Sequence, residues 1–134
     1  MMNQQVLIDS LPQGKLSADN YRLAESAMPD PKDGEVLVKT IAFAITAGTR
    51  AGLQGSASYA GAPTTGVVMN STGVGEVIES HAAGFSAGDR VIGPTGWQAF
   101  SAQKADGLTL INPAHDPVDY LGPLGVNGLT AYFG

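Results

Sequence analysis

Short runs of apolar residues, separated by turns rich in glycine, proline and aspartate, fill the first 111 residues of the chain. Several runs alternate between apolar and polar positions, which is the pattern of a strand with one buried face. The turn signals recur about every 8–12 residues, as in domains built from many short strands. We therefore predict roughly seven strands, drawn from the segments 6–8, 21–24, 35–45, 65–69, 73–79, 90–93, 97–102 and 108–111.

Beyond Pro117 the apolar positions change their spacing. The apolar residues then recur mostly at intervals of three, at Leu121, Leu124, Val126, Leu129 and Tyr132, which favours helix over strand. Residues 47–63 are rich in small residues and lack periodicity, so we predict a loop there, with one helical turn at 49–53. The expected fold is mostly β, a barrel or sandwich with short helices appended at its end.

The composition indicates a folded domain without a membrane span. Hydrophobic residues make up 43% and charged residues 14% of the 134 positions, which is not the balance of a disordered chain. No apolar run approaches the roughly 18–20 residues that cross a bilayer. The first nine residues lack the basic and apolar blocks of a secretory signal. We therefore expect a cytoplasmic protein.

Cysteine content and charge exclude several kinds of site and argue against one class of partner. The chain has no cysteine, which excludes disulfides, a cysteine–zinc site and a thiol nucleophile. The net charge of −5 and the scattered positions of the seven Lys and Arg argue against a nucleic-acid partner. His81 and His115 are the two histidines, and neither has a second metal ligand nearby in the sequence. We predict no metal site and interpret both histidines as solvated loop residues.

Five segments in order carry a family resemblance. They read GEVLVK at 34–39, GVGEVIES at 73–80, GFSAGDRV at 84–91, GWQAF at 96–100 and LGVNGLTAYFG at 124–134. Together they resemble the N-terminal half of medium-chain dehydrogenase/reductases. The last two segments are similar to the zinc-free branch that contains leukotriene B4 12-hydroxydehydrogenase, prostaglandin reductase and double-bond reductases.

The resemblance implies a GroES-like β-barrel that forms the catalytic domain of an oxidoreductase. In whole members of this branch a Rossmann domain follows, and hydride passes from NADPH to the β-carbon of an α,β-unsaturated aldehyde or ketone. The protein holds the cofactor and the substrate carbonyl in register, because the cofactor performs the chemistry.

The nucleotide-binding domain is not recognisable in this sequence. Gly73-Val74-Gly75 begins a glycine fingerprint, but its third position falls on Ile78. We therefore expect residues 1–134 to be one GroES-like catalytic-domain fragment that ends at the crossing to a missing nucleotide-binding domain. Such a fragment is expected to be inactive alone. The paired glycines are expected to allow a close strand approach or a bulge.

The resemblance also suggests which residues meet the cofactor. The segment 125–132 is expected to run beneath the nicotinamide and its ribose, so that Val126, Asn127 and Thr130 are the candidate contacts. Thr130 matches the threonine of the family, whereas Asn127 replaces its usual proline or threonine. The alternative role for Asn127 and Thr130 is to cap the start of a helix.

The candidate substrate pocket comes from two regions. Segment 45–50 aligns with the Asp-Pro-Tyr-Met-Arg stretch of the family, which implicates Thr46, Gly48 and Arg50. Gly48 replaces a tyrosine that would reach the substrate carbonyl, so the pocket is expected to be larger and to lack one donor. Tyr59 and Trp97 are further candidates for its lining. Arg50 has a solvated or interface role as its alternative, and Trp97 has core packing.

Two other functions and one partner remain open from the sequence. The barrel alone fits a stand-alone binding module like the co-chaperonins, and the superfamily also contains quinone reductases. The helical ending favours the enzyme fragment, because a co-chaperonin has no use for it. We also expect the apolar residues between Leu121 and Phe133 to form a homodimer contact.

Overall fold

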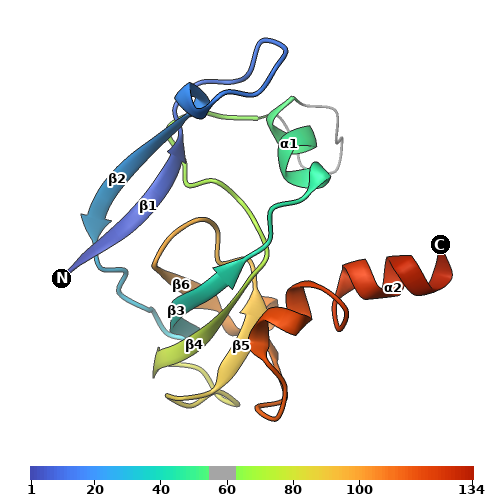
Figure 1. Cartoon of the computed structure of the whole chain (residues 1–134). Coiled ribbons are helices and arrows are strands. Elements are labelled where there is room, and N and C mark those ends of the chain that lie inside the picture. Colours follow the sequence, from blue (N-terminus) through green and yellow to red (C-terminus); the bar gives the residue numbers. More distant parts are fainter. Residues whose placement is uncertain (55–62) are drawn as a thin grey trace.

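The computed structural model describes residues 1–54 and 63–134. Within these residues, strands that pair antiparallel form two sheets (Figure 1). Their bounds are β1 Met2–Ile8, β2 Tyr21–Ala27, β3 Glu35–Phe43, β4 Gly73–Ser80, β5 Arg90–Gly93, β6 Phe100–Lys104 and β7 Thr109–Leu110. The predicted β-rich architecture is confirmed.

The sheets are unequal in size. β1 and β2 form a two-stranded hairpin, and the larger sheet has the order β6-β3-β4-β5-β7. β1 is tied to the segments that follow β3 and β5 by isolated bridges from Gln5 to Gln98 and from Leu7 to Val68. These links close the strands into the GroES-like barrel.

Helices are short and lie at two places. α1, Ala47–Leu53, follows β3 directly, and α2, Val126–Phe133, ends the chain. Single 3₁₀ turns occupy Ala18–Asn20, Ala105–Gly107 and Pro117–Leu121. The helical turn predicted at 49–53 and the helices predicted after Pro117 are therefore confirmed. Among the described residues, no helix is long and apolar enough to cross a membrane.

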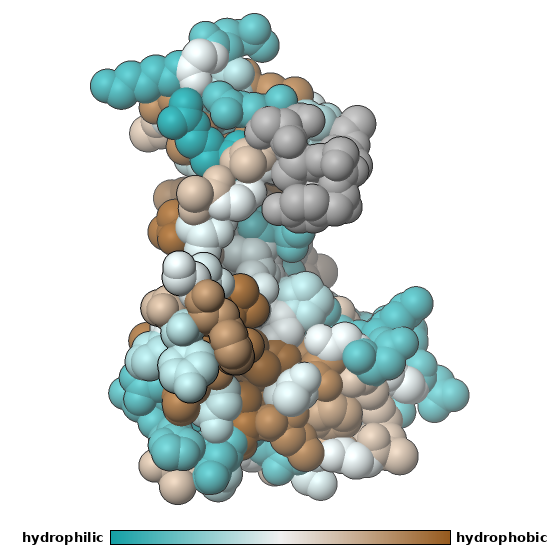
Figure 2. All heavy atoms as spheres, turned by 90° about the vertical axis from the view of Figure 1, so that its right-hand side faces the viewer, coloured by the Kyte–Doolittle hydropathy of each residue, from teal (hydrophilic) through white to brown (hydrophobic). Residues whose placement is uncertain are grey.

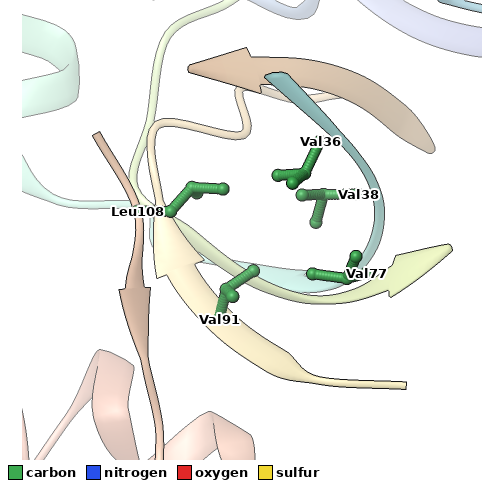
Figure 3. Packing of buried hydrophobic residues seen from close by; sticks show 5 residues of the cluster. All are labelled: Val36, Val38, Val77, Val91 and Leu108. Carbon is green, nitrogen blue, oxygen red and sulfur yellow. The ribbon is translucent and has the colours of Figure 1, made fainter. Parts of the chain in front are cut away.

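The interior of the larger sheet is a small aliphatic cluster (Figure 3). Val36 and Val38 point to the same side of β3 because side chains alternate along a strand, and both are fully buried. They meet Val77 of β4, Val91 of β5 and Leu108. β-branched residues fit such a pleated, buried surface well, so this cluster stabilises the pairing of the central strands.

A second cluster joins the hairpin to α1. Ile8, Leu53 and Met69 are buried together, with Tyr21 and Trp97 packed against them. The ring of Trp97 stacks on Phe43 at a centroid distance of 5.3 Å and lies 5.4 Å from the ring of Tyr21. Trp97 therefore has the core-packing role.

The predicted glycine-dependent approach is present between β3 and β4. A Cβ atom on Gly75 would overlap the side chain of Val38 and the carbonyl of Lys39, and one on Gly73 would overlap the hydroxyl of Thr95. The β3–β4 register shifts between Leu37 and Val38 and again near Ala42, as at β-bulges. Glycine is required at these two positions because a side chain would overlap its neighbours, and neither position has a positive φ.

The prediction of a strand at 65–69 is wrong. This segment makes one isolated bridge, at Val68, although the backbone amides of Gly66 and Met69 donate to β1. Gly66 has a φ of 75°, which bends the chain and prevents a continuous ladder. The strand predicted at 97–102 begins only at Phe100, because Trp97 and Ala99 pair with other segments.

Replacing Gly75 by alanine should destabilise the fold by about 2 kcal/mol, since the new methyl group would force the β3 backbone aside. Urea unfolding followed by circular dichroism measures this as a lower midpoint. Gly107→Ala is the matched control, because a Cβ there meets no described atom within 4 Å. Equal midpoints for Gly75→Ala and Gly107→Ala would contradict this account of the pairing.

Candidate active site

Two walls of a cavity begin at the same end of the β3–β4 pair. Phe43, the last residue of β3, lies opposite Gly73, the first residue of β4. Just outside this pair, the amide of Ala44 donates to the carbonyl of Thr72 at 2.8 Å. The chain then enters α1 on one side, and segment 63–72 arrives on the other. The hydrogen bond at the end of the β3–β4 pair thus positions both α1 and segment 63–72.

The cavity has a volume of about 920 Å³ and lies between α1, segment 63–72, the ends of β5 and β7, and the start of α2. Volumes of this size hold small organic ligands and cofactors. Figure 2 looks onto this side of the molecule, where apolar residues gather over the lower half.

The wall combines apolar side chains with uncharged polar groups. Apolar members include Leu53, Ile92, Leu110, Leu121 and Leu124. The polar members are hydroxyls and side-chain amides, among them Thr46, Thr49, Asn70, Ser71, Thr72 and Asn127. None of the described lining residues is charged. Such a wall suits an uncharged, largely apolar ligand.

Thr46 and Thr49 form a polar corner at the start of α1. The amide of Thr46 donates to the hydroxyl of Thr49 at 3.1 Å, and the two hydroxyl oxygens lie 3.3 Å apart. One hydroxyl donates to the other, so the second keeps its proton for another acceptor. Thr46 and Gly48, both predicted for the substrate pocket, line the cavity.

Arg50 lies on the other side of α1 from Gly48. Its Nη2 atom donates to the carbonyl of Gly14 at 3.1 Å, and Nε2 of Gln54 donates to the same carbonyl at 3.4 Å. Arg50 is exposed and does not line the cavity. Its contact fixes α1 against the loop between β1 and β2 and favours the interface role, while a place for Arg50 in the substrate pocket stays a prediction.

The two predicted aromatic candidates do not add to the described wall. Trp97 lies in the second core cluster rather than among the lining residues. The stacking of its ring on Phe43 favours the core role, and the pocket role of Trp97 stays a prediction. Tyr59 lies outside the described residues.

The start of α2 supplies the opposite wall. Val126 and Asn127 line the cavity, and Nδ2 of Asn127 donates to the carbonyl of Leu121 at 3.2 Å. Thr130 lies one turn further along and is not among the lining residues. Its hydroxyl donates to the carbonyl of Val126 at 2.8 Å. The N-cap of α2 is Gly125, so the capping role weighed for Asn127 and Thr130 is wrong.

The histidines lie apart from this cavity. Nε2 of His81 is 2.7 Å from a carboxylate oxygen of Glu79, and the ring of His115 contacts that of Tyr120 edge-on. Both histidines are exposed. Within residues 1–54 and 63–134, no group of three or more His, Cys, Asp or Glu side chains is arranged to hold a metal ion.

Segment 70–72, which lies between the two strands predicted at 65–69 and 73–79, is a further part of the wall. The Oγ atom of Ser71 is buried and has no hydrogen-bond partner among the described residues. Tyr120 also lines the cavity, and its hydroxyl accepts from the amide of Asn112 at 3.0 Å. Sequence periodicity cannot reveal such residues, because they meet the cavity through tertiary packing.

Comparison with known proteins identifies a matching family model and several relatives of the chain. Residues 4–111 match a family model described as the N-terminal domain of oxidoreductase. YfmJ of Bacillus subtilis, whose name assigns it to NADP-dependent oxidoreductases, is 36% identical over 98% of this chain. The NADPH-dependent curcumin reductase of Escherichia coli is 32% identical over 98% of it. Prostaglandin reductase 1 of Bos taurus is 30% identical over 86% of it.

A solved structure agrees with these relatives. CurA from Vibrio vulnificus, solved in complex with NADPH, superposes with a TM-score of 0.87 at 30% identity over 97% of this chain. The chain spans 39% of the length of CurA, of YfmJ and of the curcumin reductase. The resemblance seen in the five sequence segments is confirmed: the chain belongs to the family of N-terminal domains of oxidoreductases.

Proposed function

We propose that this chain is the substrate-side domain of an NADPH-dependent oxidoreductase that reduces the C=C bond of α,β-unsaturated aldehydes and ketones. The observation that carries the proposal is the uncharged cavity between α1 and the start of α2. The similarity to a curcumin reductase and to a prostaglandin reductase supports this substrate class. A nucleotide-binding domain outside these 134 residues would complete the enzyme.

The residues at the cavity fit the nicotinamide end of the cofactor. A nicotinamide ring is apolar on its faces and carries one carboxamide, which needs both a donor and an acceptor. Val126 offers an apolar surface, and the side-chain amide of Asn127 offers both kinds of polar group. The lack of a cation among the described lining residues leaves the phosphates to the other domain. NADPH, when bound, supplies the hydride.

The protein side of the reaction would be orientation and exclusion of water. Leu53, Leu121 and Leu124 cover apolar parts of a substrate, which strengthens the polar contacts inside the cavity. The free hydroxyl proton of the Thr46–Thr49 pair is suited to a substrate carbonyl oxygen, where negative charge develops as the β-carbon is reduced.

The proton for the α-carbon would come from a neutral group. The described wall holds no Asp, Glu, His, Lys or Cys. A hydroxyl or a water molecule is therefore the source. Such a site depends on how well the reactants are aligned rather than on a tuned acid and base.

The 134-residue chain alone should reduce no enone and should bind NADPH far more weakly than the complete oxidoreductase. It offers the nicotinamide about two polar contacts, each worth about 0.5–1.5 kcal/mol. Titration calorimetry measures the affinity, and NADPH absorbance at 340 nm measures turnover with oct-3-en-2-one.

The complete oxidoreductase is the positive control in both assays. Micromolar affinity of the isolated chain for NADPH would mean that the cofactor site lies within these residues. A complete enzyme that consumes NADPH with quinones but with no enone would assign it to the quinone reductases instead.

We also propose that α2 forms a contact with a second copy of the chain. Leu129 and Phe133 lie one turn apart on α2 and are 60% and 79% exposed. Tyr132 beside them is 81% exposed, and α2 contains no charged residue. An apolar stripe of this kind is self-complementary across a two-fold axis, and its burial is favourable.

Leu129→Asp should abolish the dimer, because an aspartate at the stripe would be buried without a partner. Sedimentation equilibrium at high micromolar concentration measures the mass. Ala131→Asp is the matched control, since Ala131 is exposed on the opposite side of α2. A monomeric wild-type chain, or a dimer that persists in Leu129→Asp, would show that this contact does not form.

A further inference from the structure

Asn70 lies in an extended stretch of chain whose backbone is fixed on both sides. The amide of Met69 donates to the carbonyl of Val6 at 2.9 Å. The carbonyl of Ser71 accepts from the amide of Gly96 at 3.1 Å. The stretch contains no turn and leads directly into β4. The backbone of Asn70 therefore has little freedom to move.

Side chains in this stretch point alternately toward the core and away from it, because successive residues of an extended chain face opposite sides. Met69 is 2% exposed and belongs to the second core cluster, and the Oγ atom of Ser71 is buried. Asn70 and Thr72 are exposed, and both line the cavity. Asn70 therefore presents its side chain to the cavity from a fixed backbone.

The carboxamide of Asn70 makes no hydrogen bond to another described residue. The side-chain amide of Asn127, on another wall, already donates to the carbonyl of Leu121. The amide of Asn70 keeps its N–H donors and its carbonyl acceptor for a ligand. Because the backbone beside it is fixed, this short side chain loses little conformational freedom when it binds.

Asn70 and Thr46 start from the same point of the fold but belong to different walls. The two walls meet where the amide of Ala44 donates to the carbonyl of Thr72 at 2.8 Å. Thr46 comes two residues after Ala44, and Asn70 comes two residues before Thr72. Two residues span at most about 7 Å, so both side chains start near the end at which the walls meet. All four residues line the cavity.

We propose that the carboxamide of Asn70 is a second hydrogen-bond donor to the substrate carbonyl, opposite the free hydroxyl proton of the Thr46–Thr49 pair. The proposal rests on the proposed function, because it assigns a catalytic contact in the same reaction. A donor from each wall would hold the carbonyl oxygen at the end of the cavity where the walls meet.

The reaction makes this oxygen the place where charge develops. As the β-carbon accepts a hydride from NADPH, the electron pair of the C=C bond moves between the α-carbon and the carbonyl carbon. The π pair of the carbonyl moves to its oxygen, which gives an enolate. The enolate becomes the saturated ketone when the α-carbon takes a proton. Donors that are already in place stabilise the oxygen most while it carries the charge.

Asn70→Leu in the complete NADPH-loaded oxidoreductase tests the proposal, because leucine keeps the size of the side chain and removes its donors. We expect kcat for oct-3-en-2-one to fall by about hundredfold and KM to change by less than about threefold, since an oxyanion donor acts mainly in the transition state.

Gln4→Leu is the matched control. Gln4 is exposed on β1, its side-chain amide has no partner among the described residues, and it does not line the cavity. Its removal should leave kcat unchanged. A kcat of Asn70→Leu within about threefold of the wild type, or an equal loss in Gln4→Leu, would overturn the proposal.

Asn70→Asp provides a readout that a merely structural role would not move. Its kcat should be low near pH 8, because a carboxylate has no proton to donate. It should rise as the pH falls toward about 5, where the carboxylic acid begins to form and can donate. The wild type should show no such rise. A flat pH profile for Asn70→Asp would contradict the assignment.

Binding to the 134-residue chain separates this proposal from the proposed function. In ¹H–¹⁵N NMR spectra without NADPH, octan-2-one should shift the side-chain amide signals of Asn70 and leave those of Gln4 in place. The absence of a shift at Asn70 would overturn the proposal even where the complete enzyme reduces enones. A shift at Asn70 with no enone turnover by the complete protein would support the ketone contact and contradict the reductase activity.

Discussion

The close approach of β4 to β3 is the constraint on which the rest of the structure depends. Gly73 and Gly75 let the two backbones come nearer than any side chain would allow. The same pairing brings Val38 and Val77 together in the core. It also ends where α1 and segment 63–72, two of the cavity walls, begin, since the amide of Ala44 donates to the carbonyl of Thr72 just beyond the last pair. The pairing of β3 with β4 thus determines both the core of the fold and the position of the site.

The chemistry of the cavity follows from what its described walls contain. Hydroxyls and amides at Thr46, Thr49 and Asn127 can orient uncharged polar groups, and the aliphatic residues around them exclude water. The described part of the wall has no charged side chain with which to bind a phosphate or to act as a strong acid. A domain of this kind is suited to hold a substrate against a cofactor whose remaining parts bind elsewhere.

Local sequence patterns predicted most of the fold but only part of the site. Turn signals and alternation located β3, β4 and β5, and the glycine pair predicted their close approach. The bend at Gly66 broke a segment that has strand propensity, because its positive φ is a tertiary feature. Arg50 and Trp97 have the residue types of a pocket, yet their partners, Gly14 and Phe43, are distant in sequence. The sequence does not show which way such side chains face.

A crystal structure of the complete oxidoreductase with NADPH and an unreactive saturated ketone would test the central claim most directly. We predict that the nicotinamide ring lies against Val126 and Asn127. The ketone oxygen should lie within hydrogen-bond distance of the Thr46–Thr49 hydroxyl pair. A nicotinamide bound away from the start of α2, or a ketone held outside the cavity between α1 and α2, would contradict the assignment of this domain as the substrate side of the enzyme.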